Sequence, residues 1–210
     1  MSHRLTFLRH GQSVANRDGI VQGHLDSPLS ALGRKQAEAI ATAWELEPLR
    51  YELIISSPLK RASETASILS DRLGIPIELE PQWVERDLGH AQGTRVQDFL
   101  GASRRRPARP PFNAAYEDGE GSWDLYLRAA TAVQSVVRRP PGRYLIVSHG
   151  GILNGAMRVI LGVAPGPGHA PRFELGNCGY AHLSMDTEGA WTVHALCNPT
   201  DTSSPDEAEP

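Results

Sequence analysis

Three short apolar segments of this chain each run directly into a polar turn, and this repeated arrangement restricts its fold more than any other feature. The segments with their turns are residues 5–11 (LTFLRHG), 53–58 (LIISSP) and 144–150 (YLIVSHG). A short apolar run bounded by turn residues is typical of a buried strand. We therefore expect three buried strands, each of which ends in a polar loop.

Segments with helical spacing of apolar residues separate these strands. We expect helices over residues 29–46 and 58–73, a third from Ser122 onward, and a fourth that follows Gly151 and closes at Gly162. The expected apolar faces are Leu32, Gln36, Ala39, Ile40 and Ala43 on the first helix and Trp123, Tyr126, Leu127, Ala130, Val133 and Val137 on the third. Strands that alternate with helices predict an α/β fold, with helices on both faces of a mainly parallel central sheet.

The rest of the chain adds weaker strand signals and an irregular excursion. Residues 75–79 predict an edge strand, because Pro76 has no N–H for a central ladder, and residues 180–196 predict a hairpin. We expect one domain over residues 1–199, with a small cap excursion at about 90–121 and a disordered acidic tail at 200–210.

The three polar turns are expected to converge, because ligands of open α/β sheets bind beyond the carboxyl ends of the strands. Convergence brings Arg9, His10, Arg61 and His149 into one pocket. Neighbouring guanidinium groups repel each other unless an anion lies between them, and a phosphate accepts their paired N–H donors well. Amides at the starts of the helices after His10, Pro58 and His149 are expected to add donors. The pattern predicts a phosphate site.

Histidine gives such a site a chemical role. A neutral imidazole nitrogen of His10 can attack phosphorus, and the neighbouring arginines oppose its protonation. His149 is expected to stay charged and to stabilise the transferring group. Glu85 is the candidate general acid and base, although Asp87 competes with it for that role.

These residues lie in motifs that resemble those of the histidine phosphatase superfamily, which also contains the cofactor-dependent phosphoglycerate mutases. The motifs are residues 8–13 (LRHGQS) followed by Asn16, 21–30 (VQGHLDSPLS), 56–62 (SSPLKRA) and 148–151 (SHGG), and the similarity runs from Leu5 to about Leu196. The resemblance implies a phosphoglycerate mutase-like fold and a phosphohistidine on His10, without metal or other cofactor. It also places Glu85 at the proton donor and implies phosphate contacts by Arg9, Arg61, Asn16, Gln22 and Gly150, with His149 as the second histidine.

The resemblance covers both phosphatases and mutases. The mutases of the family commonly have Thr-Gly-Trp where this chain has residues 22–24 (QGH), and they carry a longer excursion, so we favour a phosphatase acting on small phosphomonoesters. Residues 84–93 retain some mutase character, and a mutase therefore stays open. A phosphoprotein phosphatase and a non-catalytic phosphate-binding module are further alternatives. The family's Gly-Glu-Ser is interrupted in residues 119–122 (GEGS), so neither Glu120 nor Ser122 receives a catalytic role.

The excursion carries a run of basic residues, Arg104, Arg105, Arg106 and Arg109. Two interpretations stay open for this run. It is either a recognition element for a second anionic group at the pocket mouth or a solvated basic loop.

Composition bears on partners and compartment. A net charge of -3 argues against a nucleic-acid binder, and no apolar run approaches the roughly 20 residues that cross a bilayer. With no h-region near the first residues, and with Cys178 and Cys197 expected to be reduced thiols, we predict a cytoplasmic protein. The expected partner is a small phosphorylated metabolite, a homodimer stays open, and the histidine spacing predicts no metal site.

Overall fold

The computed structural model describes residues 2–47, 50–105, 118–166 and 171–199. Within these residues one six-stranded sheet has the order β3-β2-β4-β1-β5-β6. The strands are β1 (His3–Arg9), β2 (Leu53–Ser56), β3 (Ile77–Leu79), β4 (Arg143–Ser148), β5 (Tyr180–Met185) and β6 (Trp191–Cys197). The longer helices are α2 (Ala31–Leu46), α3 (Lys60–Leu73), α4 (Val96–Arg105), α5 (Ser122–Val137) and α6 (Gly150–Ile160), and the short ones are α1 (Val14–Arg17), η1 (Pro81–Trp83) and η2 (Gly89–Ala91).

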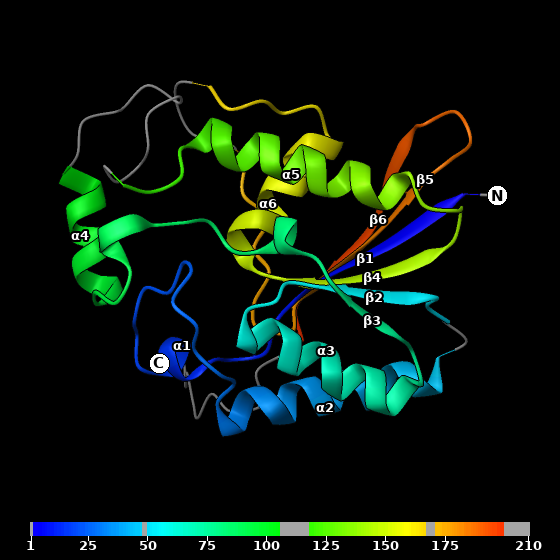
Figure 1. Ribbon diagram of the computed structural model, residues 1–210, viewed down its shortest axis with the longest axis horizontal. Helices are drawn as coiled ribbons and strands as arrows, with labels where there is room; N and C mark the ends of the chain where they lie inside the picture. The colour runs from blue at the N-terminus through cyan, green and yellow to red at the C-terminus, as the bar shows by residue number, and fades with distance from the viewer. Residues whose placement is uncertain (1, 48–49, 106–117, 167–170, 200–210) are drawn as a thin grey trace, which may run out of the picture.

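The sheet is mainly parallel, as predicted. Strands β3, β2, β4 and β1 pair in parallel, while β5 and β6 form an antiparallel hairpin beside β1. The predicted edge position of β3 is confirmed. Helices α5 and α6 cover one face of the sheet and α2 and α3 cover the other (Figure 1), which confirms the three-layer α/β/α fold.

Predictions for three of the helices need correction. Helix α3 begins at Lys60 rather than Pro58, and it ends, as expected, at Gly74 in a left-handed conformation with φ of 66°. The buried face of α2 consists of Gly33, Ala37, Ile40, Ala41 and Trp44, and that of α5 of Leu125, Ala129, Ala132, Val133 and Val136. The apolar faces predicted for α2 and α5 were therefore wrong, because they share with the buried faces only Ile40 on α2 and Val133 on α5.

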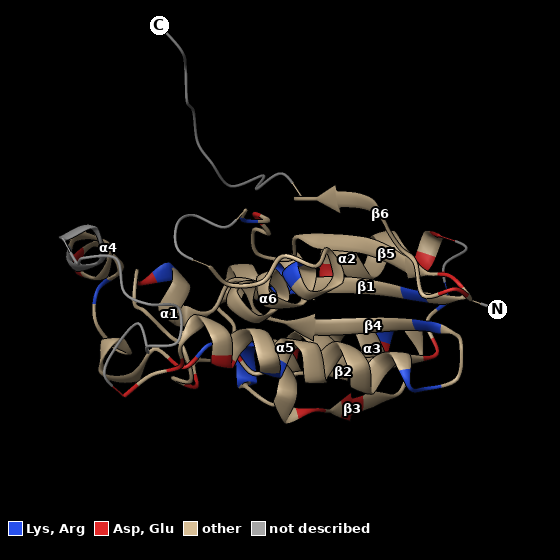
Figure 2. Cartoon of the chain, turned by 90° about the horizontal axis from the view of Figure 1, so that it is seen from above, with Lys and Arg blue, Asp and Glu red and all other residues tan. Residues whose placement is uncertain are grey.

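The three predicted strand ends lie at one edge of the sheet. Arg9 at the end of β1 pairs with Ser148 of β4, and Ser56 at the end of β2 pairs with Val147 of β4. Because these parallel strands run in register, their following turns emerge side by side, at the end of the molecule that carries α1 and α4 (Figure 2). The predicted convergence is confirmed.

The excursion begins against the loop that follows α1. The Val21 N–H binds the Thr94 carbonyl, and the Val96 N–H binds the Gly19 carbonyl. Arg106 and Arg109 lie outside the described residues, as do the side chains of Arg104 and Arg105 and the tail 200–210. The expected roles of the basic run and the tail therefore stay predictions.

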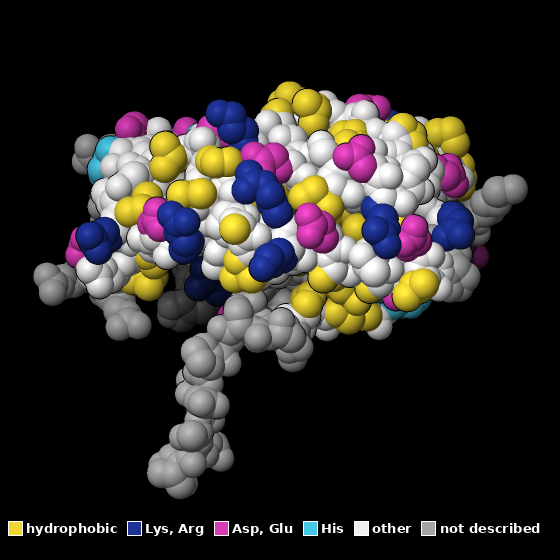
Figure 3. Space-filling model, turned by 90° about the horizontal axis from the view of Figure 1, so that it is seen from below, with side chains coloured by type: hydrophobic (Ala, Val, Ile, Leu, Met, Phe, Trp, Pro, Cys, Tyr) yellow, Lys and Arg dark blue, Asp and Glu magenta, His cyan; other side chains and the backbone are white. Residues whose placement is uncertain are grey.

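The outer face of the α2–α3 layer carries charges of both signs. Figure 3 shows Lys and Arg side chains interspersed with Asp and Glu rather than gathered in one patch. The pairs Arg34–Glu64 and Arg72–Glu45 link α2 to α3 across this exposed face. No helix in the described part of the chain is both long and apolar enough to span a membrane.

Candidate active site

His10 lies in the turn after β1 and is almost completely buried, with 3% of its surface exposed. Its Nδ1 lies 2.7 Å from the Gly11 carbonyl oxygen, which can only accept, so Nδ1 carries the proton and donates. Burial lowers the pKa of His10 well below its usual value, and the charges of Arg61 and Arg9 lower it further. His10 is therefore a neutral imidazole whose Nε2 lone pair is available.

Arg61 enters the site from the first turn of α3 and is buried. Its Nε donates to Nδ1 of His149 at 3.1 Å, while Nη1 and Nη2 donate to the carbonyls of Leu25 and Gly23. Three of its five N–H donors are used in this way, which leaves two for a ligand. Burial lowers the pKa of Arg61 to about 10, so the group remains a cation at neutral pH.

His149 corrects one prediction. Its Nδ1 accepts from Arg61, and its Nε2 lies 2.7 Å from the Ser57 hydroxyl. Since an arginine only donates, Nδ1 is unprotonated and the single proton lies on Nε2. Burial and the nearby Arg61 also lower the pKa of His149 well below its usual value. The expected charged His149 is therefore wrong for this arrangement, and the arginines supply the positive charge of the site.

Arg9 stands at the end of β1, beside the start of α6. Its Nη1 donates to the Leu175 carbonyl at 2.7 Å, whereas its buried Nε has no hydrogen-bond partner among the described residues. A Cβ on Gly150 would lie 3.8 Å from that Nε, in ordinary van der Waals contact, so Gly150 lies directly beside the guanidinium. An unpaired buried N–H is costly, and an anion would satisfy it.

Asn16 and Gln22 meet at Ser13. The Ser13 N–H and hydroxyl lie 3.2 and 3.0 Å from Asn16 Oδ1, and the same hydroxyl lies 2.7 Å from Gln22 Oε1. Because the backbone N–H must face an oxygen, the Asn16 amide is oriented with its NH₂ group turned away from Ser13. The two predicted amide residues are thus brought together and oriented by one serine.

The carboxylate of Glu85 lies at the start of α6. It accepts from the N–H groups of Gly151 at 3.0 Å and Ile152 at 3.1 Å, and from that of Arg86 at 2.7 Å. These three backbone N–H groups hold the carboxyl group in place at the start of α6. The negative charge of Glu85 also raises the pKa values of Arg9 and Arg61 against the effect of burial. Glu85 therefore interacts electrostatically with both arginines.

This arrangement corrects the prediction that helix starts supply free donors for phosphate. Two amides of α6 bind Glu85 instead, and the Lys60 N–H at the start of α3 binds Asp26 at 2.7 Å. Asp87 is held elsewhere, since its Oδ1 accepts from the Gly89 N–H and its Oδ2 lies 3.9 Å from His24 Nδ1. The contacts favour Glu85 over Asp87 as the carboxyl group of the site.

Several residues of the site carried no sequence signal. Ser57 was part of a predicted turn without a role, and Ser13 was part of a motif without one. Asn177, whose Nδ2 lies 3.2 Å from the His10 carbonyl, comes from a loop after α6 to which no prediction applied.

Cys178 follows Asn177 and is buried, with a positive φ of 56°. Burial raises the pKa of its thiol to about 12. The expectation of a free thiol at Cys178 and Cys197 is confirmed.

Comparison with known proteins identifies the family. Residues 5–199 match the model of the histidine phosphatase superfamily (branch 1). A relative named "Probable phosphoglycerate mutase GpmB" from Enterobacter sp. (strain 638) is 32% identical over 189 residues, which cover 88% of this chain and 85% of the relative.

Solved structures of phosphatases share the fold. A mycobacterial glucosyl-3-phosphoglycerate phosphatase has a TM-score of 0.75 at 27% identity, covering 95% of this chain and 100% of its own. A putative alpha-ribazole-5'-P phosphatase from Escherichia coli has a TM-score of 0.77 at 25% identity, covering 93% of this chain and 96% of its own. With a family model that spans nearly the whole chain, the protein belongs to the histidine phosphatase superfamily.

Proposed function

We propose that the protein is a metal-independent phosphatase that hydrolyses small phosphomonoesters through a phosphohistidine on His10. The observation that carries the proposal is the contact of His10 Nδ1 with the Gly11 carbonyl at 2.7 Å, which leaves Nε2 of this buried imidazole unprotonated. The charges of Arg61 and Arg9 act on the same ring and help to lower its pKa. An imidazole nucleophile needs an unprotonated nitrogen, and a phosphoryl group needs positive charge around its oxygens. Both conditions meet at this residue.

In the first step, the Nε2 lone pair of His10 forms a bond to phosphorus while the bond from phosphorus to the ester oxygen breaks. The N–H groups of Arg9 and Arg61 that bind no protein group stabilise the phosphoryl oxygens, together with the amides of Asn16 and Gln22. Glu85, in its protonated form, gives its proton to the leaving alkoxide. The products of this step are an alcohol and a phosphohistidine with an ionised Glu85.

In the second step, water attacks the phosphohistidine. Glu85 takes a proton from the water as its oxygen bonds to phosphorus, and the bond between phosphorus and His10 Nε2 breaks. Inorganic phosphate leaves and the starting state returns. Glu85 suits both steps because the backbone N–H groups of Gly151 and Ile152 hold its carboxyl group at the start of α6, where it interacts electrostatically with Arg9.

A second candidate is a phosphoglycerate mutase, which the name of the relatives from Enterobacter and Yersinia supports. A mutase returns the phosphoryl group to a second hydroxyl and must keep water away from the phosphohistidine. The phosphatases among the structural neighbours, and the shorter excursion, favour hydrolysis. Both activities require His10, so they differ in what accepts the phosphoryl group.

The test measures release of inorganic phosphate from an aryl phosphate and from 3-phosphoglycerate, with excess chelator, for the wild type and for His10→Ala. Release that survives the chelator and disappears in His10→Ala supports the proposal. If neither ester yields phosphate, while 3-phosphoglycerate is converted to its isomer in the presence of a bisphosphorylated primer, the mutase is correct instead. Activity that persists in His10→Ala would show that His10 is not the nucleophile.

A further inference from the structure

The segment that carries Glu85 has no strand or long helix to fix its backbone. Gln82 and Trp83 belong to the single turn η1, and Val84 and Glu85 continue from it into a loop. An acid that must reach a leaving oxygen needs a defined position, because misplacement by about 1 Å can cost 10²-fold in rate. Side chains from other elements must therefore hold this segment.

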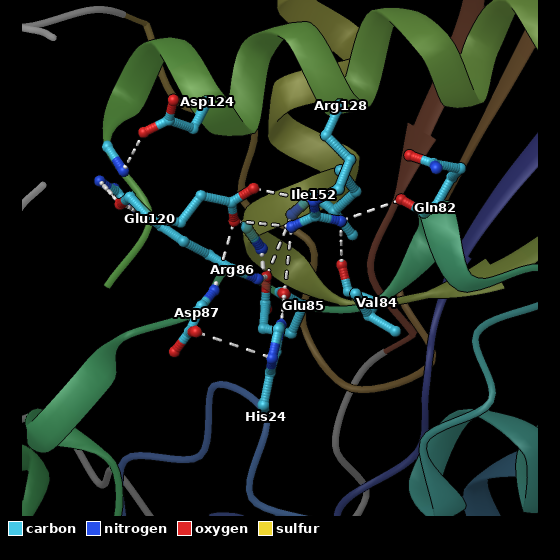
Figure 4. Close-up of polar contacts among 12 residues, drawn as sticks. His24, Gln82, Val84, Glu85, Arg86, Asp87, Glu120, Asp124, Arg128 and Ile152 are labelled. Carbon is cyan, nitrogen blue, oxygen red and sulfur yellow. Dashed lines mark hydrogen bonds and ion pairs between the residues drawn. The ribbon is translucent and has the colours of Figure 1, made fainter. Parts of the chain in front are cut away.

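Arg128 on α5 supplies most of those contacts (Figure 4). Its Nη1 donates to the carbonyls of Gln82 at 2.9 Å and Val84 at 2.7 Å, and its Nη2 donates to the carbonyl of Glu85 at 3.2 Å. The Ser148 hydroxyl binds the remaining carbonyl of the segment, that of Trp83, at 2.6 Å. Every carbonyl from 82 to 85 is thus bound by a side chain, and three of the four are bound by Arg128.

Glu120 holds Arg128 in this position. Its two carboxylate oxygens accept from Nε and Nη2 of Arg128 at 2.8 and 2.7 Å, and the side chains are only 18% and 12% exposed. A paired, buried ion pair of this kind fixes the plane of the guanidinium. Glu120 also binds the chain beyond Glu85, since its backbone N–H donates to the Asp87 carbonyl at 2.9 Å. The pair therefore holds the catalytic segment from both sides.

We infer that Arg128 and Glu120 are positioning residues for Glu85: they fix the segment 82–85 so that its carboxyl group meets the start of α6 and the leaving-group oxygen. The activity part of this inference rests on the proposed function. The positioning itself does not, because the amides of Gly151 and Ile152 report on the Glu85 carboxylate without any turnover. Neither Arg128 nor Glu120 touches the reacting atoms.

Arg128→Lys is the decisive variant. Lysine retains the charge beside Glu120, but one ammonium group cannot bind three carbonyls and a carboxylate in the fork geometry of arginine. The matched control is Arg139→Lys, since Arg139 is a 26% exposed arginine that pairs through two nitrogens with Glu78. Arg139 lies just before the amino end of β4, at the opposite end of that strand from the site. Glu85→Gln provides the reference for a lost carboxyl group.

Two readouts separate positioning from general stability. In NMR spectra, the Gly151 and Ile152 amide resonances of Arg128→Lys should shift in the direction seen for Glu85→Gln, whereas those of Arg139→Lys should keep their wild-type values. In kinetics, kcat/KM of Arg128→Lys should fall about 10- to 100-fold for an alkyl ester such as glycerol phosphate. This ratio covers the steps up to cleavage of the ester bond and leaves out the later attack of water, in which Glu85 also acts. For p-nitrophenyl phosphate, whose leaving group needs no proton, kcat/KM should fall by less than about 3-fold.

The outcomes are distinct. If the Gly151 and Ile152 amide resonances of folded Arg128→Lys are unchanged, the inference is overturned, whatever the activity. An equal loss of kcat/KM for both esters in Arg128→Lys also overturns it, provided that Glu85→Gln loses activity selectively for the alkyl ester. Shifted amides together with an unselective Glu85→Gln would support the positioning and refute the acid role of Glu85. In the double variant Glu85→Gln/Arg128→Lys, we expect no loss of alkyl ester turnover beyond that of Glu85→Gln alone, and a further selective loss would count against the inference.

Discussion

The Nε of Arg61 donates to Nδ1 of His149 across 3.1 Å, so an arginine of α3 determines which nitrogen of a histidine beyond β4 carries the proton. The remaining nitrogen, Nε2, is left to donate to Ser57, whose hydroxyl lies 2.7 Å away. Two strand ends and a helix start are joined in this way, because Ser57 follows β2, Arg61 lies in the first turn of α3 and His149 follows β4. A neutral His149 thus serves as a link between the buried arginine and the sheet.

Removing the Ser57 hydroxyl tests this link. Ser57→Ala leaves the Nε2–H of His149 without its acceptor in a site where His149 is 0% exposed, and a buried unpaired donor costs about 1–3 kcal/mol. We expect the free energy of unfolding, measured in urea, to fall by that amount. Ser63→Ala is the control, since the Ser63 hydroxyl bonds only to the Lys60 carbonyl on an exposed turn and should change stability by less than about 0.5 kcal/mol. A proton on both nitrogens of His149 in imidazole ¹⁵N spectra at pH 7 would contradict the neutral assignment.

The buried histidines also make stability depend on pH. The pKa values of His10 and His149 are well below the usual value of 6.5, so the unfolded state binds more protons than the folded state below about pH 6.5. Their contribution is fully present above that pH and is lost as the pH falls, at up to about 1.4 kcal/mol per pH unit for each group. We expect the free energy of unfolding to decline from pH 7 to pH 5.5, and to decline less steeply in His149→Asn.

The control for this pH dependence is His194→Asn, which replaces an exposed histidine on β6. It should retain the wild-type slope between pH 7 and pH 5.5. A wild-type stability that stays level over this range would contradict the assignment of both buried histidines as neutral.

The close approach of α2 to the His10 loop gives a steric prediction. A Cβ on Gly33 would lie 2.0 Å from the carbonyl oxygen of Gln12, and one on Gly11 would lie 2.4 Å from the carbonyl oxygen of Gly33. These are backbone atoms, so Gly33→Ala must push the loop and the helix apart. We expect a loss of about 1–3 kcal/mol in stability and a loss of activity, because the same loop holds His10.

Gly101→Ala is the matched change in α4, where an added Cβ meets nothing within 4 Å. Alanine in a helix interior should raise stability by about 0.5–1 kcal/mol and leave the His10 loop unchanged. If Gly33→Ala and Gly101→Ala proved equally stable and equally active, α2 would not lie as close to the backbone of the His10 loop as the structure shows.

The buried strands could be predicted from the sequence because they are apolar on both faces and end in recognisable turns. The buried face of α5 could not be predicted in this way, because apolar residues occupy more than one side of that helix. Its packed side uses Ala129 against α6, where a Cβ on Gly155 would lie 3.1 Å from the Ala129 Cβ. The larger Trp123 and Tyr126, which a hydrophobicity pattern favours as core, instead contact each other with ring centroids 5.6 Å apart. Small residues occupy the packed side of α5 because α5 and α6 approach each other closely.

The same distinction applies to the site. His10, Arg61 and His149 could be found because they lie in turns after predicted strands or at a helix start. Their partners could not, because a hydrogen bond such as that from Asn177 to the His10 carbonyl has no fixed spacing in sequence. The charge of His149 was mispredicted for a related reason. It depends on Arg61 binding Nδ1, which only the folded geometry determines.

Ser13 provides a test of the phosphate-binding half of the site. Its hydroxyl donates to Gln22 Oε1 at 2.7 Å and also caps α1, accepting from the Asn16 N–H at 3.0 Å, while the Ser13 backbone N–H orients the Asn16 amide. Ser13→Ala should therefore lower stability by about 1 kcal/mol, as loss of an N-cap does, and should weaken inhibition by inorganic phosphate about 10-fold, the equivalent of roughly 1.4 kcal/mol. Ser30→Ala is the control, because Ser30 caps α2 through Gly33 and does not contact either amide. It should cost similar stability and leave the inhibition constant for phosphate near its wild-type value. An equal weakening in both variants would mean that phosphate affinity follows loop stability rather than the orientation of the Gln22 amide.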